Sequence, residues 1–243
     1  MESVVSRMHR SLEAPSFERR GRAALRLNRT LSALPERYVV EFGRSAWDKP
    51  FDFFDEDDTA LVRWRTTQAA IRLEGRIVGA IEFAEYEAAA VHEREFFDVM
   101  DAESYEMARV ASVLLSAWRD ALDRVLGYGR LLEIRWVWVE PNHPVAGIWI
   151  PVLEALMARV ERYTAVVLAM AFPLEYEGKL PEGAPRRSAF ERRRRAMLRY
   201  YERRLGLTSL PSPLGGQGWL WRPGPYVDDL IPRPRYRKGW ASA

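Results

Sequence analysis

The sequence predicts an α/β fold with a mixed, mostly antiparallel central sheet flanked by helices. Three observations lead to this fold class. Two alternating runs around a Glu-Gly turn form a hairpin at 69–83. Apolar residues at steps of three and four form a helix at 102–126. From residue 131 onward strands and helices alternate, which gives a mixed sheet with helices packed against it.

The N-terminal part adds an extension and a loop to this plan. The first 36 residues form a helical extension, in which leucines stand among arginines until Pro35 ends the run. A strand at 37–43 follows. Residues 48–58 then form a loop rich in Asp, Glu and Phe. Its charge suits a cationic amine, but an acidic surface loop that binds nothing is the simpler interpretation.

The predicted helix at 102–126 has the clearest pattern in the chain. Its apolar residues share one face, which must be buried. We expect that face to pack on the sheet or on the N-terminal helix, or to form a contact in a homodimer. Gly127 and Gly129 end the helix. The apolar face consists of Met107, Val110, Ala111, Leu114, Trp118, Ala121, Leu122 and Val125.

The C-terminal half is a series of alternating elements. They are a strand at 131–139, a helix at 148–162, a strand at 165–171, a helix at 189–205 and a strand at 218–222. The strand at 165–171 is wholly apolar, as in a central strand covered on both faces. A loop rich in proline, glycine and charge spans 173–188. We therefore expect one domain at 37–223, with the extension at 1–36 before it. A tail rich in proline and arginine follows at 224–243.

Composition excludes several kinds of functional site. The 243 residues include no cysteine, which excludes disulfides, thiolate zinc sites, iron–sulfur clusters and a cysteine nucleophile. The three histidines, at positions 9, 92 and 143, form no close pair. We therefore expect neither a histidine-based metal centre nor a charge-relay triad.

Charge and hydropathy also limit the function classes. The 37 basic and 34 acidic residues give a net charge of +3, which argues against general nucleic-acid binding. Most basic residues are arginine, a bias associated with GC-rich bacterial or phage genomes. The longest apolar run, at 165–174, is shorter than the about 20 residues of a membrane span. The N-terminus has no apolar signal region, so we expect a cytoplasmic protein.

Four segments occur in an order that is similar to one known family. They are Val137-Trp138-Val139-Glu140-Pro141, the loop and helix start at 142–149, the apolar strand at 166–174, and the helix and strand at 197–222. Together with the hairpin at 69–83, they resemble the GCN5-related N-acetyltransferase family, whose members transfer acetyl groups from acetyl-CoA to amines. The resemblance implies a GCN5-related acyltransferase domain at 37–223. The helix at 102–126 is an insertion relative to the usual pattern of that family.

The resemblance implies that acetyl-CoA binds where the strand at 131–139 leads into the helix at 148–162. The N–H groups and dipole of a helix start can hold a pyrophosphate without charged side chains. The Arg/Gln-x-x-Gly-x-Gly/Ala loop of the family is only partly present, because Pro144 and Val145 replace usual residues and Pro151 removes one donor. The alternative is a helix start that binds nothing. The implied contact residues are Trp138, Val139, Val145, Ala146, Gly147, Ile148 and Trp149.

The resemblance also implies two catalytic residues. Glu133 resembles the glutamate that deprotonates the amine in the histone-acetylating branch, and partial burial makes a carboxylate a better base. Tyr201 resembles the tyrosine that protonates the departing thiolate, because a phenol pKa of about 10 lies near that of a thiol. Alternatively, Tyr201 belongs to the core and Glu133 is an exposed residue paired with Arg135 or Arg72. We expect His143 to be an exposed loop residue rather than a phosphate ligand.

The function that the resemblance implies is acetyl-CoA-dependent N-acetylation of a small-molecule or protein amine, by direct attack on the thioester. One alternative is a catalytically inactive protein of the same fold that binds a protein or nucleic-acid partner. A third interpretation is an arginine-rich nucleic-acid module. The arginines at 186–204 form either a solvated face or a docking surface for an acidic protein, a nucleic acid or the 3′-phosphate of CoA. One row on that face consists of Arg192, Arg195, Arg199 and Arg203.

Overall fold

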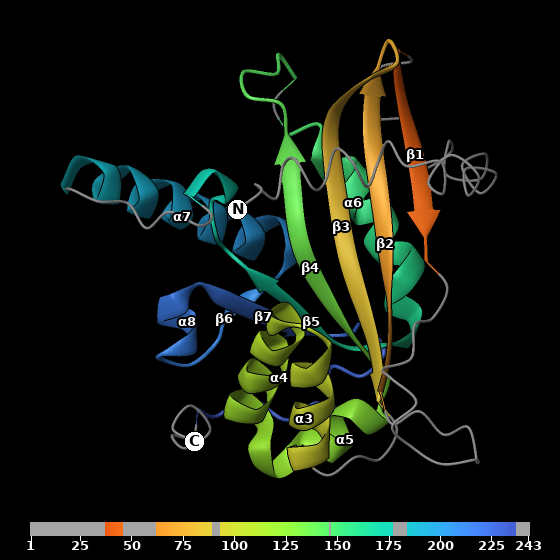
Figure 1. The fold of residues 1–243 in the computed structure, drawn as a ribbon, viewed down its shortest axis with the longest axis vertical. Coiled ribbons are helices and arrows are strands. Elements are labelled where there is room, and N and C mark those ends of the chain that lie inside the picture. The colour runs from red at the N-terminus through yellow and green to blue at the C-terminus, as the bar shows by residue number, and fades with distance from the viewer. Residues whose placement is uncertain (1–36, 46–61, 89–92, 146, 177–183, 237–243) are drawn as a thin grey trace.

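The computed structural model describes residues 37–45, 62–88, 93–145, 147–176 and 184–236. In these residues, seven strands form one sheet in the order β1-β2-β3-β4-β5-β7-β6 (Figure 1). The strands are β1 (Tyr38–Arg44), β2 (Val62–Leu73), β3 (Arg76–Ala88), β4 (Arg130–Val139), β5 (Thr164–Met170), β6 (Thr208–Ser209) and β7 (Trp219–Pro223). The predicted extension at 1–36 and the acidic loop at 48–58 lie outside the described residues.

The helices lie between and after these strands. They are α3 (Glu93–Glu103), α4 (Tyr105–Trp118), α5 (Leu122–Gly127), α6 (Trp149–Val160), α7 (Ala184–Leu205) and α8 (Leu214–Gln217), with 3₁₀ turns η2 (Arg119–Ala121), η3 (Glu161–Tyr163) and η4 (Leu174–Tyr176). Strands β1 to β4 pair in sequence and antiparallel. β5 runs parallel to β4, because α6 carries the chain back between them, and β7 is antiparallel to β5. The predicted α/β class with a mixed, mostly antiparallel sheet is therefore confirmed.

The hairpin of β2 and β3 has the predicted turn but longer strands than the expected 69–83. Glu74 and Gly75 have φ angles of 51° and 82°. A two-residue type I′ turn needs a positive φ at both of these positions. The pairing shifts by one residue between Ile71 and Arg72. This bulge sets the register of the rest of the hairpin.

The prediction of one helix at 102–126 is wrong, because this region forms three helices and begins at Glu93. Ser104 separates α3 from α4 and caps α4, since its Oγ accepts the Met107 N–H at 3.2 Å. The turn η2 separates α4 from α5. Trp118 is buried and packs edge-on against Trp221 of β7, with ring centres 5.2 Å apart. The expected packing of this region on the sheet is confirmed.

The C-terminal elements also differ from the prediction. Helix α7 begins at Ala184, five residues before the expected start at 189, and β6 and α8 were not predicted. The segment after β7 packs on the helices α3 to α5. The indole N–H of Trp118 donates to the Pro232 carbonyl at 2.7 Å, and the Arg235 N–H donates to the Ala117 carbonyl at 2.8 Å.

Helices cover both faces of the sheet. The cluster around α3, α4 and α5 packs on one face, and the cluster around α6 and the C-terminal half of α7 packs on the other. A smaller cluster of Ala70, Ile77 and Ala80 packs with the partly buried Trp136 and Trp138. None of the described helices is long and apolar enough to cross a membrane.

Candidate functional site

The parallel strands β4 and β5 pair over only part of their length. Their ladder ends at Ile134 and Ala169, whereas β4 continues to Val139 with β3 as its partner. Figure 1 shows the ends of β4 and β5 pointing in different directions. In the ladder with β3, Arg135 is an extra residue, because Glu82 pairs with Trp136 and Phe83 with Ile134. This bulge bends β4 where it leaves β5.

The separation leaves one edge of β4 open. From residue 135 to residue 139, no described strand pairs with the edge of β4 that faces β5. Backbone N–H and C=O groups at such an edge are available to an extended ligand. The open edge is therefore the first component of the candidate site.

Residues on the open part of β4 share one apolar cluster with α6 and α7. Partly buried residues of β4, the loop before α6, α6 and α7 pack against one apolar cluster. The rings of Trp149 and Tyr200 lie 4.7 Å apart between centres, with a tilt of 45°. Trp138 is the exception among the implied contact residues, because it packs in the separate cluster on the other face of the sheet. The residues that share the first cluster are Val137, Val139, Val145, Trp149, Met197 and Tyr200.

The start of α6 offers few but well-placed donors. Gly147 has a φ of +70°, and a Cβ there would lie 2.6 Å from the Cδ1 of Ile150, so the turn requires glycine. The N–H of Ile150 donates to the Gly147 carbonyl, and Pro151 has no N–H. The N–H groups of Ile148 and Trp149 remain as the donors of the first turn. Ala146 lies outside the described residues.

The loop before α6 is anchored by His143, and the expectation that this residue is exposed is wrong. Its side chain is 2% exposed. Its Nε2 lies 3.1 Å from the hydroxyl of Tyr38 in β1, and its Nδ1 lies 3.8 Å from Glu140. Glu140 in turn accepts a hydrogen bond from Arg76 at 2.8 Å. These contacts attach the loop to β1 and β3, at the edge of the candidate site.

Glu133 belongs to a buried polar network where β4 and β5 separate. The Tyr86 hydroxyl donates to Glu133 at 2.8 Å, and Arg135 lies 3.5 Å from the same oxygen. Arg135 also donates to the Tyr86 hydroxyl at 3.2 Å and pairs with Glu82 at 3.4 Å. The side-chain amide of Gln68 donates to Glu82 at 2.6 Å. We call these five residues the Glu133 network.

Glu133 is therefore buried rather than exposed, and its partner is Arg135, while Arg72 pairs with Glu41 at 2.7 Å. Burial and the nearby Glu133 raise the pKa of Tyr86 well above its usual value, so its hydroxyl stays protonated. Burial alone would lower the pKa of Arg135, but Tyr86 and the two carboxylates of the network outweigh burial and raise it. The network therefore combines two carboxyl groups with a single guanidinium.

The two tyrosines of α7 differ in their surroundings. Tyr201 is buried in the apolar cluster, and burial, with a smaller effect of Tyr200, raises its pKa to about 12. Tyr200 is only partly buried and faces Trp149. Burial also raises the pKa of Tyr200, against the opposing effect of Arg204. Tyr200, rather than the predicted Tyr201, is thus the tyrosine beside the start of α6.

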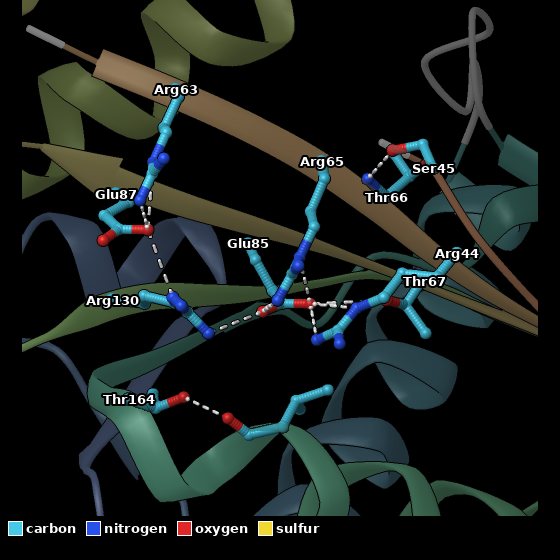
Figure 2. A network of polar contacts seen from close by, with 11 residues as sticks. Arg44, Ser45, Arg63, Arg65, Thr66, Thr67, Glu85, Glu87, Arg130 and Thr164 are labelled. Carbon is cyan, nitrogen blue, oxygen red and sulfur yellow. Dashed lines mark hydrogen bonds and ion pairs between the residues drawn. The ribbon is translucent and has the colours of Figure 1, made fainter. Parts of the chain in front are cut away.

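A second polar network was not foreseen from the sequence (Figure 2). Its centre is Glu85, which is 1% exposed. Arg44 and Arg65 each donate to this carboxylate, Arg65 at 2.7 Å, and Thr67 donates at 3.3 Å. Arg130 lies 3.7 Å away. Burial would raise the pKa of Glu85, but Arg65 and Arg44 outweigh it and lower the pKa.

The same network includes Glu87, which pairs with Arg63 at 3.0 Å and with Arg130 at 3.4 Å. These arginines likewise lower the pKa of Glu87, although partial burial opposes them. Four arginines thus surround two carboxylates. The register pairs Arg63 with Glu87 and Arg65 with Glu85 across β2 and β3, and that cross-strand pattern was the available sequence signal. We call this the Glu85 network.

Comparisons and ligand chemistry add two findings. A scan against models of known protein families and a search of curated proteins find no match. Among the residues that the structure describes, histidine and acidic side chains form no group of three suited to a metal ion.

Proposed function

We propose that the protein is an acetyl-CoA-dependent N-acetyltransferase in which an amine attacks the thioester directly. The observation that supports this proposal most strongly is the open edge of β4 next to the start of α6. The pantetheine arm of acetyl-CoA is an extended chain with amide groups, so it can pair with an open strand edge as an added strand does. The pyrophosphate then lies toward the helix start, whose N–H groups and dipole favour an anion.

Three elements of this chain would hold the acetyl-CoA. The N–H groups of Ile148 and Trp149 face the pyrophosphate, and Gly147 allows the close approach of backbone that such contacts need. Val137 and Val139 form an apolar wall along the pantetheine arm. When bound, acetyl-CoA supplies the activated acetyl group.

Glu133 acts as the base in this proposal. The amine nitrogen bonds to the acetyl carbon, the carbon–sulfur bond breaks, and the proton of the amine passes to Glu133 directly or through water. Arg135 and Tyr86 hold the carboxylate in place through the contacts described above. The two carboxyl groups of the Glu133 network also suit a cationic amine.

A tyrosine of α7 supplies the proton for the departing thiolate. Tyr201 occupies the position at which the resembled family has its tyrosine, whereas Tyr200 lies beside Trp149. The variants Tyr200→Phe and Tyr201→Phe separate the two assignments, since only the acid should lose turnover without losing acetyl-CoA binding. A loss of turnover in neither variant would remove tyrosine from the mechanism.

Calorimetric titration of the full chain with acetyl-CoA tests the proposal. We expect saturable binding, and we expect Glu133→Gln to keep that binding while turnover on amines falls about 10²–10⁴-fold, the usual contribution of a general base. Absence of heat at millimolar acetyl-CoA would contradict the proposal. The matched control is Glu87→Gln, because Glu87 is a carboxylate of the Glu85 network and lies outside the proposed chemistry.

A non-catalytic protein of the same fold is the second candidate. The observation in its favour is the contact of Trp149 with Tyr200, since these rings pack together beside the helix start. Pro151 also leaves that helix start with one donor fewer. Binding of acetyl-CoA without turnover of any amine, in a protein with an intact Glu133, would favour this candidate.

A further inference from the structure

Strand β1 forms one edge of the sheet (Figure 1). Its seven residues pair with β2 in one continuous register, without a bulge. In the part of the chain that the structure describes, no strand pairs with the outer side of β1. Edge strands of soluble proteins are commonly protected by proline, lysine, a bulge or a short length. β1 has neither proline nor lysine, so its outer side can accept another strand.

The backbone pattern of β1 determines which of its residues another strand would bond. The Ser45 N–H donates to the Thr66 carbonyl at 2.9 Å, in the register of the β1–β2 ladder. Hydrogen-bonded and non-hydrogen-bonded residues alternate along an antiparallel pair, so the odd-numbered residues 39–45 bond inward to β2. The N–H and C=O groups of the even-numbered residues 38–44 therefore point toward the outer edge.

The side chains at the beginning of β1 divide between the two faces of the sheet. Tyr38 and Val40 are buried in the cluster around α6. On the other face, Arg37 is exposed and the Val39 side chain is 56% exposed. Glu41 lies on that face too, where its Oε2 accepts a hydrogen bond from Arg72 at 2.7 Å. An exposed valine thus lies on an open strand edge between a cation and an anion.

We propose that β1 pairs antiparallel with β1 of a second copy of this chain, with Val39 on the two-fold axis. In this register, Arg37 of each copy lies opposite Glu41 of the other copy, and the two Val39 side chains meet between these ion pairs. Tyr38 lies opposite Val40 of the other copy. Pairs of opposite charge and pairs of an aromatic with a β-branched residue both stabilise neighbouring strands.

The backbone pattern and the charges together select this register. The outward groups belong to even-numbered residues, so the two strands can shift only in steps that keep even residues opposite even ones. A shift of two residues in either direction places Val39 opposite a charged residue, Arg37 or Glu41. A shift of four residues in one direction places the two Glu41 side chains opposite each other, which is unfavourable.

The same observations favour a second copy over an unrelated extended peptide. A peptide would have to carry the matching order of charge, valine and opposite charge, whereas a second copy carries it by symmetry. Two-fold dimers with one self-complementary patch are the commonest oligomers. With Val39 on the axis, the two valines form a non-hydrogen-bonded pair, in which the side chains of an antiparallel ladder lie closest together.

This surface is separate from the proposed acetyl-CoA site. None of Arg37, Val39 and Glu41 belongs to the proposed cofactor contacts or to the proposed chemistry. Tyr38 provides a link to the site, because its hydroxyl lies 3.1 Å from His143 in the loop before α6. Dimer formation can nevertheless fail or succeed independently of acetyl-CoA binding.

Sedimentation equilibrium of the full chain up to about 300 μM tests the proposal, since a small interface gives a weak dimer that depends on concentration. We expect the mass to rise from 28.2 kDa toward about twice that value. Val39→Lys should abolish the rise, because it places two like charges opposite each other at the axis. The matched control is Leu230→Lys, since Leu230 is 52% exposed and lies outside β1.

Exchange of charges tests the register itself. Arg37→Glu and Glu41→Arg should each abolish the dimer, because each places like charges opposite each other twice. An equal mixture of these two variants should form a heterodimer, since their charges are again complementary. Val39→Lys and Arg37→Glu leave the pair of Arg72 and Glu41 intact, so they test the proposal even if Glu41→Arg is unstable.

Four results would overturn the proposal. They are a parent chain that stays monomeric at every concentration, a dimer that Val39→Lys leaves intact, a dimer that Leu230→Lys also abolishes, and folded charge variants whose mixture does not associate. Melting temperatures equal to that of the parent show that the variants are folded.

Discussion

Two polar networks lie on opposite faces of the sheet, only a few residues apart along β3, and they differ in their balance of charge. The Glu85 network surrounds two carboxylates with four arginines. The Glu133 network gives two carboxylates one arginine, together with a tyrosine and an amide. In the first, the pKa values of both carboxylates are lowered, so both stay ionised in the folded protein.

This difference in the number of arginines per carboxyl group distinguishes the Glu85 network, which has a structural role, from the Glu133 network, which is part of the candidate site. Carboxylates that are surrounded by a larger number of guanidinium groups help to fix the register of the strands. They stay ionised near neutral pH and so do not exchange protons there. The Glu133 network has only one guanidinium for two carboxyl groups, and it lies where β4 leaves β5 and opens a strand edge. The comparison predicts that substitutions in the Glu85 network mainly affect stability, whereas those in the Glu133 network mainly affect turnover.

The largest effect on stability is expected for Glu85→Ala. This variant leaves the guanidinium of Arg65, which is 12% exposed, without its buried partner. Removing one member of a buried pair costs about 3–5 kcal/mol. Urea denaturation measures the change. Glu87→Ala is the control, and its cost should be smaller because Glu87 is 34% exposed. Equal costs for the two variants would contradict the assignment of Glu85 as the centre.

The pH dependence of stability provides the second test. The pKa of Glu85 in the folded protein is lower than in the unfolded chain, so the unfolded chain binds more protons in acid. The contribution of ionised Glu85 to the stability of the folded protein is therefore complete above a pH of about 5. It is lost as the pH falls below about 4. Denaturation curves at several pH values should show a shallower acid decline for Glu85→Ala than for the parent. Parallel declines would refute this contribution.

A smaller loss of stability is expected for Glu133→Gln. The amide oxygen of glutamine can still accept the hydrogen bond from Tyr86, so the cost should be about 1 kcal/mol, the usual net value of one hydrogen bond. The free energy of unfolding of this variant is compared directly with that of Glu85→Ala. If Glu133→Gln lowered the free energy of unfolding as much as Glu85→Ala does, the Glu133 network would have a structural role. That result would contradict the proposed difference between the two networks.

The smallest effect is expected at the solvent edge of the Glu85 network. Arg63 is 43% exposed, and an exposed ion pair contributes about 0–1 kcal/mol. Arg63→Gln should therefore change the free energy of unfolding by less than about 1 kcal/mol, and less still at high salt. A loss of several kcal/mol would show that the network acts as one unit rather than as a buried centre with a weak edge.

Local sequence signals predicted much of the fold. The Glu74-Gly75 turn followed from a glycine, which accepts a positive φ, between two alternating runs, and the alternation of strands and helices after residue 131 gave the sheet its mixed character. The break at Ser104 was missed because its cap is a single hydroxyl within a long apolar pattern.

The register of the strands and the burial of individual side chains could not be predicted from local sequence patterns. Without the bulge at Ile71 and Arg72, Arg65 would oppose Ala84 instead of Glu85, and the strand glycine Gly79 next to the bulge does not by itself fix the register. His143 is buried because Tyr38, more than a hundred residues earlier, packs against it. Such contacts depend on tertiary structure, and the candidate site depends on them more than the fold does.

Amide hydrogen exchange tests most directly whether acetyl-CoA binds between β4 and β5. The full chain is compared with and without saturating acetyl-CoA. The account predicts slower exchange at residues 135–139 of β4 and at Ile148 and Trp149, where N–H groups gain partners, with little change in β1 and β2. Unchanged exchange at both segments, or protection confined to another part of the chain, would contradict the account.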